Sequence, residues 1–458
     1  MSSLLLTGGR VVNPASGMDQ IADVLVLEGR VAAVGPGVAA QAPAGIPVLS
    51  VVGKVVVPGL IDLHVHFREP GQTKKEDILS GAQCAARGGF TTVVCMPNTS
   101  PAIDNAGTVA LIQDRAGKAD VRVEITGALT KGIAGEELAP IGSLFKAGVV
   151  ALTDDGHCIQ NNELMRRACE YARMFQLPVM DHCQDYGLVT KGVMHEGRYS
   201  TMLGLAGWPA AGEEVIVARN ILLAEQTGTP IHCQHLSSAG SVRLLREALS
   251  RKVPISGEAC PHHFTLTDAC IAGSEAFWKE DGAEWAQRFM AGQTLPEWPS
   301  YHTDFKMNPP LRSATDRAAI LEGLVDGTLA IISSDHAPHS KSEKEVEFDY
   351  APFGIVGLET EFALSLMALY HTGRLSLSKV VAKLTTEPAR LLRFQDGRGR
   401  LEVGGVGDVT VFDPDAEWTS LRTETASKSV NNPFHGWRMR GRVTHTVVGG
   451  RVVWTLPA

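Results

Sequence analysis

Residues 55–71 read VVVPGLIDLHVHFREPG, an apolar run that leads directly into two histidines separated by one residue. In an extended strand, side chains two positions apart point to the same side, so His64 and His66 present two imidazoles on one face. Two such imidazoles can supply half of a metal site. Histidines at the end of a strand can also be purely structural, so the rest of the chain decides between the two interpretations.

A short apolar strand followed by a helical stretch recurs eight times along the chain. Buried parallel strands read as near-continuous apolar runs, and eight βα units predict an α/β fold, a (β/α)8 barrel of the TIM type. The active site of such a barrel lies at the carboxyl ends of its strands. The predicted strands are 59–67, 91–99, 122–129, 148–156, 178–185, 230–237, 254–263 and 329–339.

The two ends of the chain show a different pattern. Short β runs around glycine-containing turns occupy 23–34 and 447–454, and 408–413 adds a further strand. We predict a small β-sandwich domain built from both termini, residues 1–54 and 400–458, beside a barrel domain at residues 55–399. The sequence assigns no chemistry to the small domain.

The composition is that of a globular protein, with 458 residues, 44% hydrophobic and 20% charged. No apolar stretch is long enough to span a bilayer, and the amino terminus lacks a basic region followed by a full signal core, so we expect a cytoplasmic protein without a membrane partner. A net charge of −8 without a basic stripe argues against nucleic-acid binding. Eight cysteines with no Cys-x-x-Cys pair are typical of buried thiols in a reducing compartment.

One segment fits neither pattern. Residues 269–305 separate the seventh predicted strand from the segment that begins at Lys306, and they carry Trp278, Trp285 and Trp298. A connection of this length has its own structure or a functional role. We consider a lid over the active site, packing on the surface, and a contact between subunits.

Polar residues with metal-binding side chains end five of the predicted strands. Imidazoles and carboxylates that converge at one barrel mouth form a nitrogen and oxygen site suited to zinc or another divalent first-row metal. Each residue alone could be structural, but their gathering at one end of the barrel predicts a metal centre. They are His64, His66, Asp154, Asp155, His182, His235, Asp335 and His336.

Longer motifs carry a resemblance to a known family. The chain is similar, over nearly its whole length, to dihydroorotase of the amidohydrolase superfamily, in its bacterial type. The His-x-His pair alone would indicate only the superfamily, whereas Phe-Arg-Glu-Pro-Gly together with Met-Pro-Asn-Thr narrows it to dihydroorotase and its nearest relatives. The motifs are Asp62-Leu-His-Val-His-Phe-Arg-Glu-Pro-Gly71, Met96-Pro-Asn-Thr99, Asp154-Asp-Gly156, His182-Cys-Gln-Asp185, Pro261-His-His263, Met307-Asn-Pro-Pro-Leu-Arg312, Asp335-His-Ala-Pro-His339 and Pro352-Phe-Gly-Ile-Val-Gly-Leu-Glu-Thr360.

The resemblance implies two zinc or similar divalent ions and assigns their ligands. One ion is held by His64 and His66, the second by His182 and His235, and a carboxylate that we assign to Asp155 bridges them. By the same resemblance, Asp335 touches one metal and moves the proton from the attacking water to the leaving nitrogen.

The substrate implied by the resemblance is dihydroorotate, a cyclic amide with an exocyclic carboxylate. Arg68 offers a planar donor fork for that carboxylate, although a salt bridge to Glu69 or another acid is the structural alternative. The remaining substrate contacts implied by the family pattern are Asn98, Asn308, His339 and the backbone near Phe353 and Gly354.

Several histidines and one aspartate are expected to lie outside the metal site. Asp154 is expected to turn away from the metals, and His232 to lie in the core because it stands three residues before His235. Adjacent histidines on a strand point to opposite sides, so at most one of His262 and His263 can face the mouth. We expect those two and His336 to be structural or to support the ligands, and His157 to lie at the rim.

Two other functions remain to be distinguished from a dihydroorotase. A dihydropyrimidinase, hydantoinase or allantoinase would share the barrel, but these relatives generally bridge their metals with a carbamylated lysine, and 148–156 contains no lysine. An inactive scaffold that supports aspartate transcarbamoylase would be expected to lose ligands, yet every ligand position is filled. The expected partners are a small-molecule substrate, a second copy in a homodimer, and aspartate transcarbamoylase.

Overall fold

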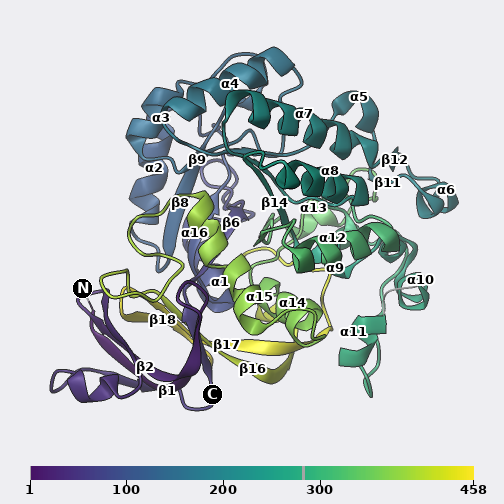
Figure 1. Ribbon diagram of the computed structural model, residues 1–458. Helices are drawn as coiled ribbons and strands as arrows, with labels where there is room; N and C mark the ends of the chain where they lie inside the picture. The colour runs from purple at the N-terminus through teal and green to yellow at the C-terminus, as the bar shows by residue number, and fades with distance from the viewer. Residues whose placement is uncertain (1, 281–283, 458) are drawn as a thin grey trace.

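In the computed structural model, which describes residues 2–280 and 284–457, eight parallel strands form a barrel (Figure 1). The seam between the first and last strands is bridged where the backbone N–H of His66 donates to the carbonyl of His336 at 2.8 Å. The predicted (β/α)8 fold is confirmed. The barrel strands are β6 Leu60–Val65, β7 Phe90–Cys95, β8 Arg122–Gly127, β9 Ala151–Leu152, β10 Val179–Asp181, β13 Ile231–Cys233, β14 Ile255–Ala259 and β15 Ile331–Ile332.

Helices follow the strands and cover the outside of the barrel. The first of them begins at Asp77, whose side chain accepts a hydrogen bond from Ser80 N, and ends at Gly89, which adopts a φ of +92°. The main outer helices are α1 Ile78–Gly88, α2 Ala106–Ala116, α3 Ile141–Ala147, α4 Asn162–Met174, α7 Ala211–Thr227, α8 Ala239–Ser250, α12 Ala314–Asp326, α15 Leu377–Lys383 and α16 Thr386–Leu391. None of the described helices is both long and apolar enough to cross a bilayer.

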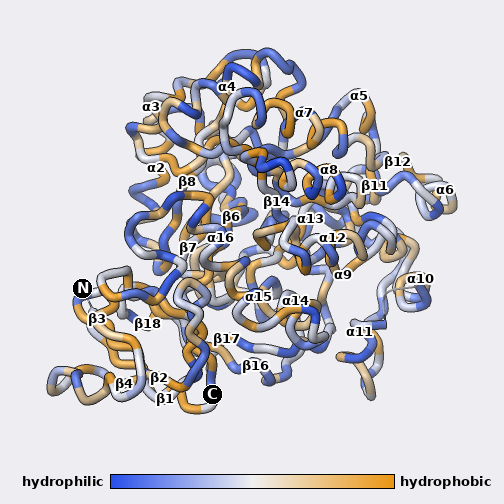
Figure 2. The backbone as a smooth tube through the Cα atoms, viewed as in Figure 1, coloured by the Kyte–Doolittle hydropathy of each residue, from blue (hydrophilic) through white to orange (hydrophobic). Residues whose placement is uncertain are grey.

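Both termini form a second sheet, which lies beside the barrel in Figure 1. Hydrophobic residues, orange in Figure 2, run along these strands and share one core cluster that includes Leu6, Val24, Val409 and Val447. The sheet contains β1 Leu4–Asn13, β2 Met18–Leu27, β3 Arg30–Gly35, β4 Val48–Ser50, β5 Val55–Pro58, β16 Val409–Thr419, β17 Arg438–Val448 and β18 Arg451–Thr455.

Two predicted boundaries differ from the structure. Strand β5 pairs with β1 and β16, so residues 55–58 belong to the terminal sheet and the barrel begins at Leu60. The seventh barrel strand ends at Ala259, and Pro261–Thr265 forms the short helix α9. His262 and His263 therefore lie on a helical turn, because Pro261 stands at its first position, where a missing N–H costs nothing. The expectation of opposite strand faces does not apply to them.

The described part of the segment 269–305 forms short helices whose buried side chains, among them Phe277, Trp285 and Phe305, join the main hydrophobic core. Trp278 lies against Trp437 with ring centroids 5.3 Å apart, and Trp298 packs on Phe305 at 4.7 Å. The first contact joins the described part of the segment to the residue just before β17, and the second lies within the segment, which fits the packing interpretation. Residues 281–283 lie outside the described residues. Its helices are η3 Asp268–Ala272, α10 Ser274–Lys279, α11 Glu284–Phe289 and η4 Thr303–Phe305.

Shorter elements complete the described chain. They are η1 Val38–Gln41, η2 Lys131–Ile133, α5 Tyr186–Val189, β11 Met194–His195, α6 Arg198–Leu203, β12 Gly207–Trp208, α13 Lys341–Lys344, α14 Glu361–Ser365, η5 Leu366–Tyr370 and η6 Arg422–Glu424.

Candidate metal centre and substrate pocket

The predicted metal ligands meet at the carboxyl ends of the barrel strands. Each belongs to the last residues of a strand or to the segment that follows it, on β6, β9, β10, β13 and β15. All of them are buried. They are His64, His66, Asp155, His182, His235 and Asp335.

Asp155 lies at the centre of this cluster. Its Oδ1 is 3.2 Å from Nε2 of His64 and 3.5 Å from Nε2 of His235, and its Oδ2 is 3.3 Å from Nε2 of His66. Nδ1 of His182 lies 3.6 Å from Oδ1. Two groups of potential ligands, one with His64 and His66 and one with His182 and His235, thus share Asp155. Asp155 thus lies between the two histidine pairs, where the sequence analysis expected the shared carboxylate.

The donor set fits a pair of divalent cations. Nε2 of His64 and Oδ1 of Asp155 are buried without a hydrogen-bond partner in the described structure, which is costly unless another group binds them. Imidazole nitrogens and carboxylate oxygens are ligands of zinc and similar metals. The arrangement therefore has both the chemistry and the unsatisfied atoms of a metal site.

Opposite charges hold the cluster together. Burial alone would raise the pKa of the Asp155 carboxyl, but the imidazoles of His64, His182 and His235 lower it well below its usual range. Burial would likewise lower the pKa of His64, whereas the carboxylates of Asp155 and Asp335 raise it well above its ordinary value. Cations bound here would take the place of imidazole protons.

Three neighbours orient the imidazoles through their outer nitrogens. Nδ1 of His64 contacts Oε1 of Glu258 at 2.9 Å, and Nδ1 of His66 contacts Oδ1 of Asn98 at 2.9 Å. Nε2 of His182 contacts Oε1 of Gln184 at 2.8 Å. When the outer nitrogen donates, the inner nitrogen keeps its lone pair for a metal. The supporting roles of Glu258 and Gln184 were not predicted from the sequence, and Asn98 was predicted only to bind substrate.

Asp335 lies beside the first histidine pair. Its Oδ1 is 3.1 Å from Nε2 of His66 and 3.5 Å from Nε2 of His64, and the residue, whose φ is +46°, lines the cavity at the mouth. Despite burial, His64 and His66 hold the pKa of Asp335 far below its usual range, so the carboxyl is ionised. The residue can contact a metal and accept a proton from the same position.

The predicted substrate residues line one cavity of about 340 Å³ above the cluster. The same cavity also exposes Gln72 and Lys75, which the sequence analysis did not name. The predicted residues in its wall are Arg68, Asn98, Asn308, His339, Phe353 and Gly354.

Arg68 offers a buried guanidinium to this cavity. Its Nε donates to the carbonyl of Pro338 at 3.2 Å, and its Nη2 lies 3.4 Å from His339. The predicted alternative, an ion pair with Glu69, does not form, because Glu69 lies 3.4 Å from Arg115 instead. Burial lowers the pKa of Arg68 to about 10, which leaves it charged at neutral pH. The cation is therefore available to an anionic group in the cavity.

Two asparagine side chains, those of Asn98 and Asn308, line the cavity and have polar atoms that can bind a ligand. Oδ1 of Asn98 contacts His66. Its amide nitrogen Nδ2 lies close to Gly156, where the Cβ of any larger residue would be 2.7 Å from that nitrogen. Asn308 donates from Nδ2 to Gln184 at 3.1 Å, while its buried Oδ1 has no partner in the described structure. An N–H group of a ligand would satisfy that oxygen.

Hydrogen bonds from other parts of the chain fix the loop that carries Phe353 and Gly354. Nε2 of His339 lies 2.8 Å from the carbonyl of Phe353. The N–H of Gly354 donates to Lys306, and its carbonyl accepts from Asn431 at 3.0 Å and from Lys344 at 3.1 Å. The backbone groups of Gly354 are thus used within the protein. Asn431 comes from the segment between β16 and β17, so the terminal domain also shapes the pocket.

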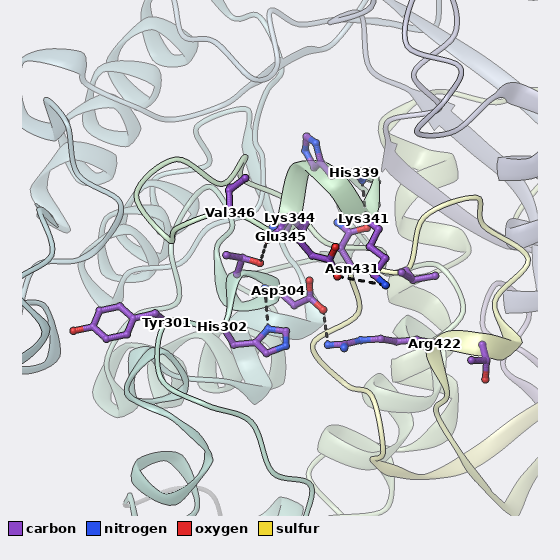
Figure 3. A pocket seen from close by; sticks show the side chains of 13 residues that line it. Tyr301, His302, Asp304, His339, Lys341, Lys344, Glu345, Val346, Arg422 and Asn431 are labelled. Carbon is purple, nitrogen blue, oxygen red and sulfur yellow. Dashed lines mark hydrogen bonds and ion pairs between the residues drawn. The ribbon is translucent and has the colours of Figure 1, made fainter.

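Figure 3 shows the side chains that line a second, larger cavity of about 510 Å³. Its wall shares His339 with the substrate pocket and is closed on one side by the ion pair between Arg422 and Asp304. It contains none of the metal-ligand groups found in the described residues. The chemistry therefore belongs to the smaller cavity.

The remaining candidates lie where the sequence analysis expected them. Asp154 turns away and accepts hydrogen bonds from Leu129 N and Thr130 N. His232 is buried in the core with Nε2 3.2 Å from Glu258, and His336 is buried with Nε2 3.5 Å from Glu76. His157 is exposed beside the mouth.

Similarity to known proteins agrees with this site. Residues 53–241 match a family model described as dihydro-orotase-like, and residues 359–454 match the amidohydrolase family. Curated proteins named dihydroorotase, from Pelotomaculum thermopropionicum and Citrifermentans bemidjiense, are 48% and 47% identical to this chain. The alignments cover 98% and 99% of this chain, and the same shares of the two relatives.

Solved structures share the fold at lower identity. An L-hydantoinase (dihydropyrimidinase) from Arthrobacter aurescens has a TM-score of 0.83 at 23% identity, covering 100% of this chain and 98% of that chain. A D-hydantoinase from Thermus sp. has a TM-score of 0.78 at 22% identity, covering 99% and 97%. At this identity the likeness establishes the architecture alone, whereas the curated relatives share nearly half of their residues with this chain. The chain belongs to the dihydroorotase family within the amidohydrolase superfamily.

Proposed function

We propose that this enzyme is a dihydroorotase, which interconverts L-dihydroorotate and N-carbamoyl-L-aspartate in pyrimidine synthesis. The observation that carries the proposal is the buried guanidinium of Arg68, which forms no ion pair with the described residues, in the cavity above the Asp155 cluster. A cyclic amide that bears a carboxylate matches this combination, since Arg binds carboxylates through its planar donor fork.

Two zinc ions are the proposed cofactors. His64 and His66 would hold one, His182 and His235 the other, with Asp155 shared between them and Asp335 beside the first. When bound, such ions activate water and polarise the carbonyl that is attacked. Glu258, Asn98 and Gln184 keep three of the four imidazoles in the tautomer and orientation that this role requires.

Asp335 is the proposed proton carrier. In hydrolysis, the oxygen of water adds to the ring carbonyl carbon and the carbon–nitrogen bond of the ring amide breaks. The ionised carboxylate of Asp335 takes the proton of the water and delivers it to the leaving nitrogen. Ring closure follows the same steps in reverse.

The substrate is oriented by the opposite wall of the cavity. Arg68 binds the exocyclic carboxylate, and the unpartnered Oδ1 of Asn308 accepts a ring N–H. His339 holds the Phe353 carbonyl, and because both backbone groups of Gly354 are already hydrogen-bonded to other parts of the protein, the backbone contribution falls to Phe353. These contacts use the ring edge and the carboxylate, and the carboxylate is the feature that distinguishes dihydroorotate from dihydrouracil.

An assay of the purified protein with dihydroorotate, dihydrouracil and allantoin side by side tests the proposal. We expect turnover of dihydroorotate well above that of the two other rings. Faster turnover of dihydrouracil or allantoin would indicate the hydantoinase type instead, and absence of turnover with metals bound would indicate a scaffold. Residues 148–156 contain no lysine that could take the place of Asp155 between the metals. This supports turnover of dihydroorotate above that of the two other rings.

Location and macromolecular partners remain predictions. The cytoplasm is the proposed compartment, supported by eight buried cysteines that are all free thiols. A homodimer and an association with aspartate transcarbamoylase are proposed from the family resemblance, and both are compatible with activity.

A further inference from the structure

A second group of metal-binding side chains lies outside the catalytic cluster. Cys260 follows strand β14 and immediately precedes the short helix α9, which carries His262 and His263, and the potential ligand atoms of the three residues lie within 4.8 Å of one another. All three residues are at most 3% exposed. No step of the proposed reaction uses them.

His263 is prepared as a ligand in the same way as the catalytic imidazoles. Its Nε2 lies 3.0 Å from the carbonyl of Pro309, which can only accept, so Nε2 carries the proton and Nδ1 keeps a lone pair. That Nδ1 is buried and has no hydrogen-bond partner in the described structure. An imidazole that donates to a backbone carbonyl and leaves its other nitrogen free is typical of metal ligands.

His262 adds a second unsatisfied nitrogen. Its Nε2 is also buried without a partner in the described residues, and the two imidazole rings lie 4.2 Å apart between centroids. Burial keeps the pKa of His263 at about 3 and that of His262 well below its ordinary value, so both rings are neutral. Two orphaned buried nitrogens in one place are costly unless a cation or another donor reaches them.

We propose that Cys260, His262 and His263 form a third metal site that takes a thiophilic divalent cation such as zinc. The cysteine distinguishes it from the catalytic pair, which offers nitrogen and oxygen ligands only. Binding requires the thiolate, so the thiol proton passes to solvent when the ion enters. Three protein ligands leave one position of a tetrahedral ion for water.

Cobalt(II) tests this site directly, because a thiolate ligand gives cobalt a charge-transfer absorption that nitrogen and oxygen ligands do not. The full-length protein is stripped with a chelator, titrated with cobalt(II), and measured for both bound metal and near-ultraviolet absorption. We expect about three equivalents per chain, with the thiolate band growing as one of them binds. Cys260→Ser should lose the band and about one equivalent while keeping the other two.

Matched variants separate the site from general effects on folding. Cys270→Ser removes another buried cysteine that lies outside the trio and should keep the band. His263→Gln retains Cys260 but should also lose the third equivalent, and thermal unfolding of each apo-protein checks that it folds.

A wild-type chain that saturates at two equivalents without a thiolate band would overturn the proposal, as would a band that survives in folded Cys260→Ser. Neither result depends on dihydroorotate turnover, which tests the proposed function separately.

Discussion

Glu258 on strand β14 accepts a hydrogen bond from Nδ1 of His64 at 2.9 Å, with both side chains completely buried. The other carboxylate oxygen of Glu258 lies 3.2 Å from Nε2 of His232 and accepts from Ser333 at 2.7 Å. Although burial opposes ionisation, His232 and His64 lower the pKa of Glu258 far below its usual range. A fixed carboxylate in the barrel interior thus directs Nε2 of His64 toward Asp155.

Replacing this carboxylate should weaken metal binding without removing a ligand. We expect Glu258→Gln to lower metal affinity by roughly tenfold to a hundredfold, because loss of a supporting hydrogen bond to a ligand imidazole has effects of that order. Competition with a chelator measures the affinity. Glu345→Gln, at an exposed rim position, serves as the control and should bind metal normally. Unchanged affinity in Glu258→Gln would show that His64 needs no such support.

Removing the charge of Asp335 should separate metal binding from chemistry. Asp335→Asn keeps the shape of the side chain but cannot carry the proton, so we expect most metal to remain while turnover falls about a hundred- to ten-thousandfold. Metal analysis and steady-state kinetics on the same sample measure both quantities. Near-normal turnover would exclude Asp335 from the proton transfer.

Arg68 should determine the preference for a carboxylate-bearing ring. Loss of its charge-assisted contact costs about 1.5–3 kcal/mol, so Arg68→Met should reduce kcat/KM for dihydroorotate by roughly tenfold to somewhat more than a hundredfold. Residual hydrolysis of dihydrouracil, which lacks the carboxylate, should change little. Arg115→Met, which removes the partner of Glu69, is the matched control. Equal losses of kcat/KM on both substrates would show that Arg68 has a structural role and does not bind the carboxylate.

The buried, neutral imidazole of His339 should make the folded protein lose stability as the pH falls into the mildly acidic range. Burial, together with Arg68, Lys344 and Lys75, lowers its pKa to about 2 in the folded chain, while an unfolded histidine titrates near 6.5. Between these values the unfolded state binds more protons, so stability falls as pH drops below about 6.5, by roughly 2 kcal/mol at pH 5. The melting temperature of His339→Asn should therefore decline less from pH 7 to pH 5 than that of the wild type. Parallel declines would contradict this assignment.

The sequence carried most of the information about the fold and the ligands. Apolar runs predicted all eight strands, because a parallel barrel buries its strands, and histidine or aspartate residues near the ends of five of them predicted the metal centre at the carboxyl ends. The pairing of Val55–Pro58 was missed, since an apolar strand in the terminal sheet looks the same as one in the barrel. The helix at Pro261–Thr265 was missed because it follows a strand without a break in apolar character.

The groups that support the site were harder to predict. Glu258 carries a weak signal, a carboxylate inside an apolar strand, which must be paired to be buried. Asn431 carries none, because it reaches the pocket from a loop more than seventy residues away in sequence from the Gly354 carbonyl that it binds, and only tertiary structure brings them together. Residue type predicts which side chains can bind a metal, whereas orientation of those side chains depends on long-range contacts.

The most direct test of the account compares the wild type with Asp155→Ala and Asp154→Asn, measuring bound metal and dihydroorotate hydrolysis in the same samples. Asp155 contacts all four imidazoles, so under the proposed function its loss would remove the carboxylate that both metals share. Within the described residues, the Asp154 side chain instead accepts hydrogen bonds from Leu129 and Thr130. We predict that the wild type and folded Asp154→Asn retain the catalytic metals and turn over dihydroorotate, and that Asp155→Ala loses both. Full turnover with normal metal content in Asp155→Ala would contradict the account.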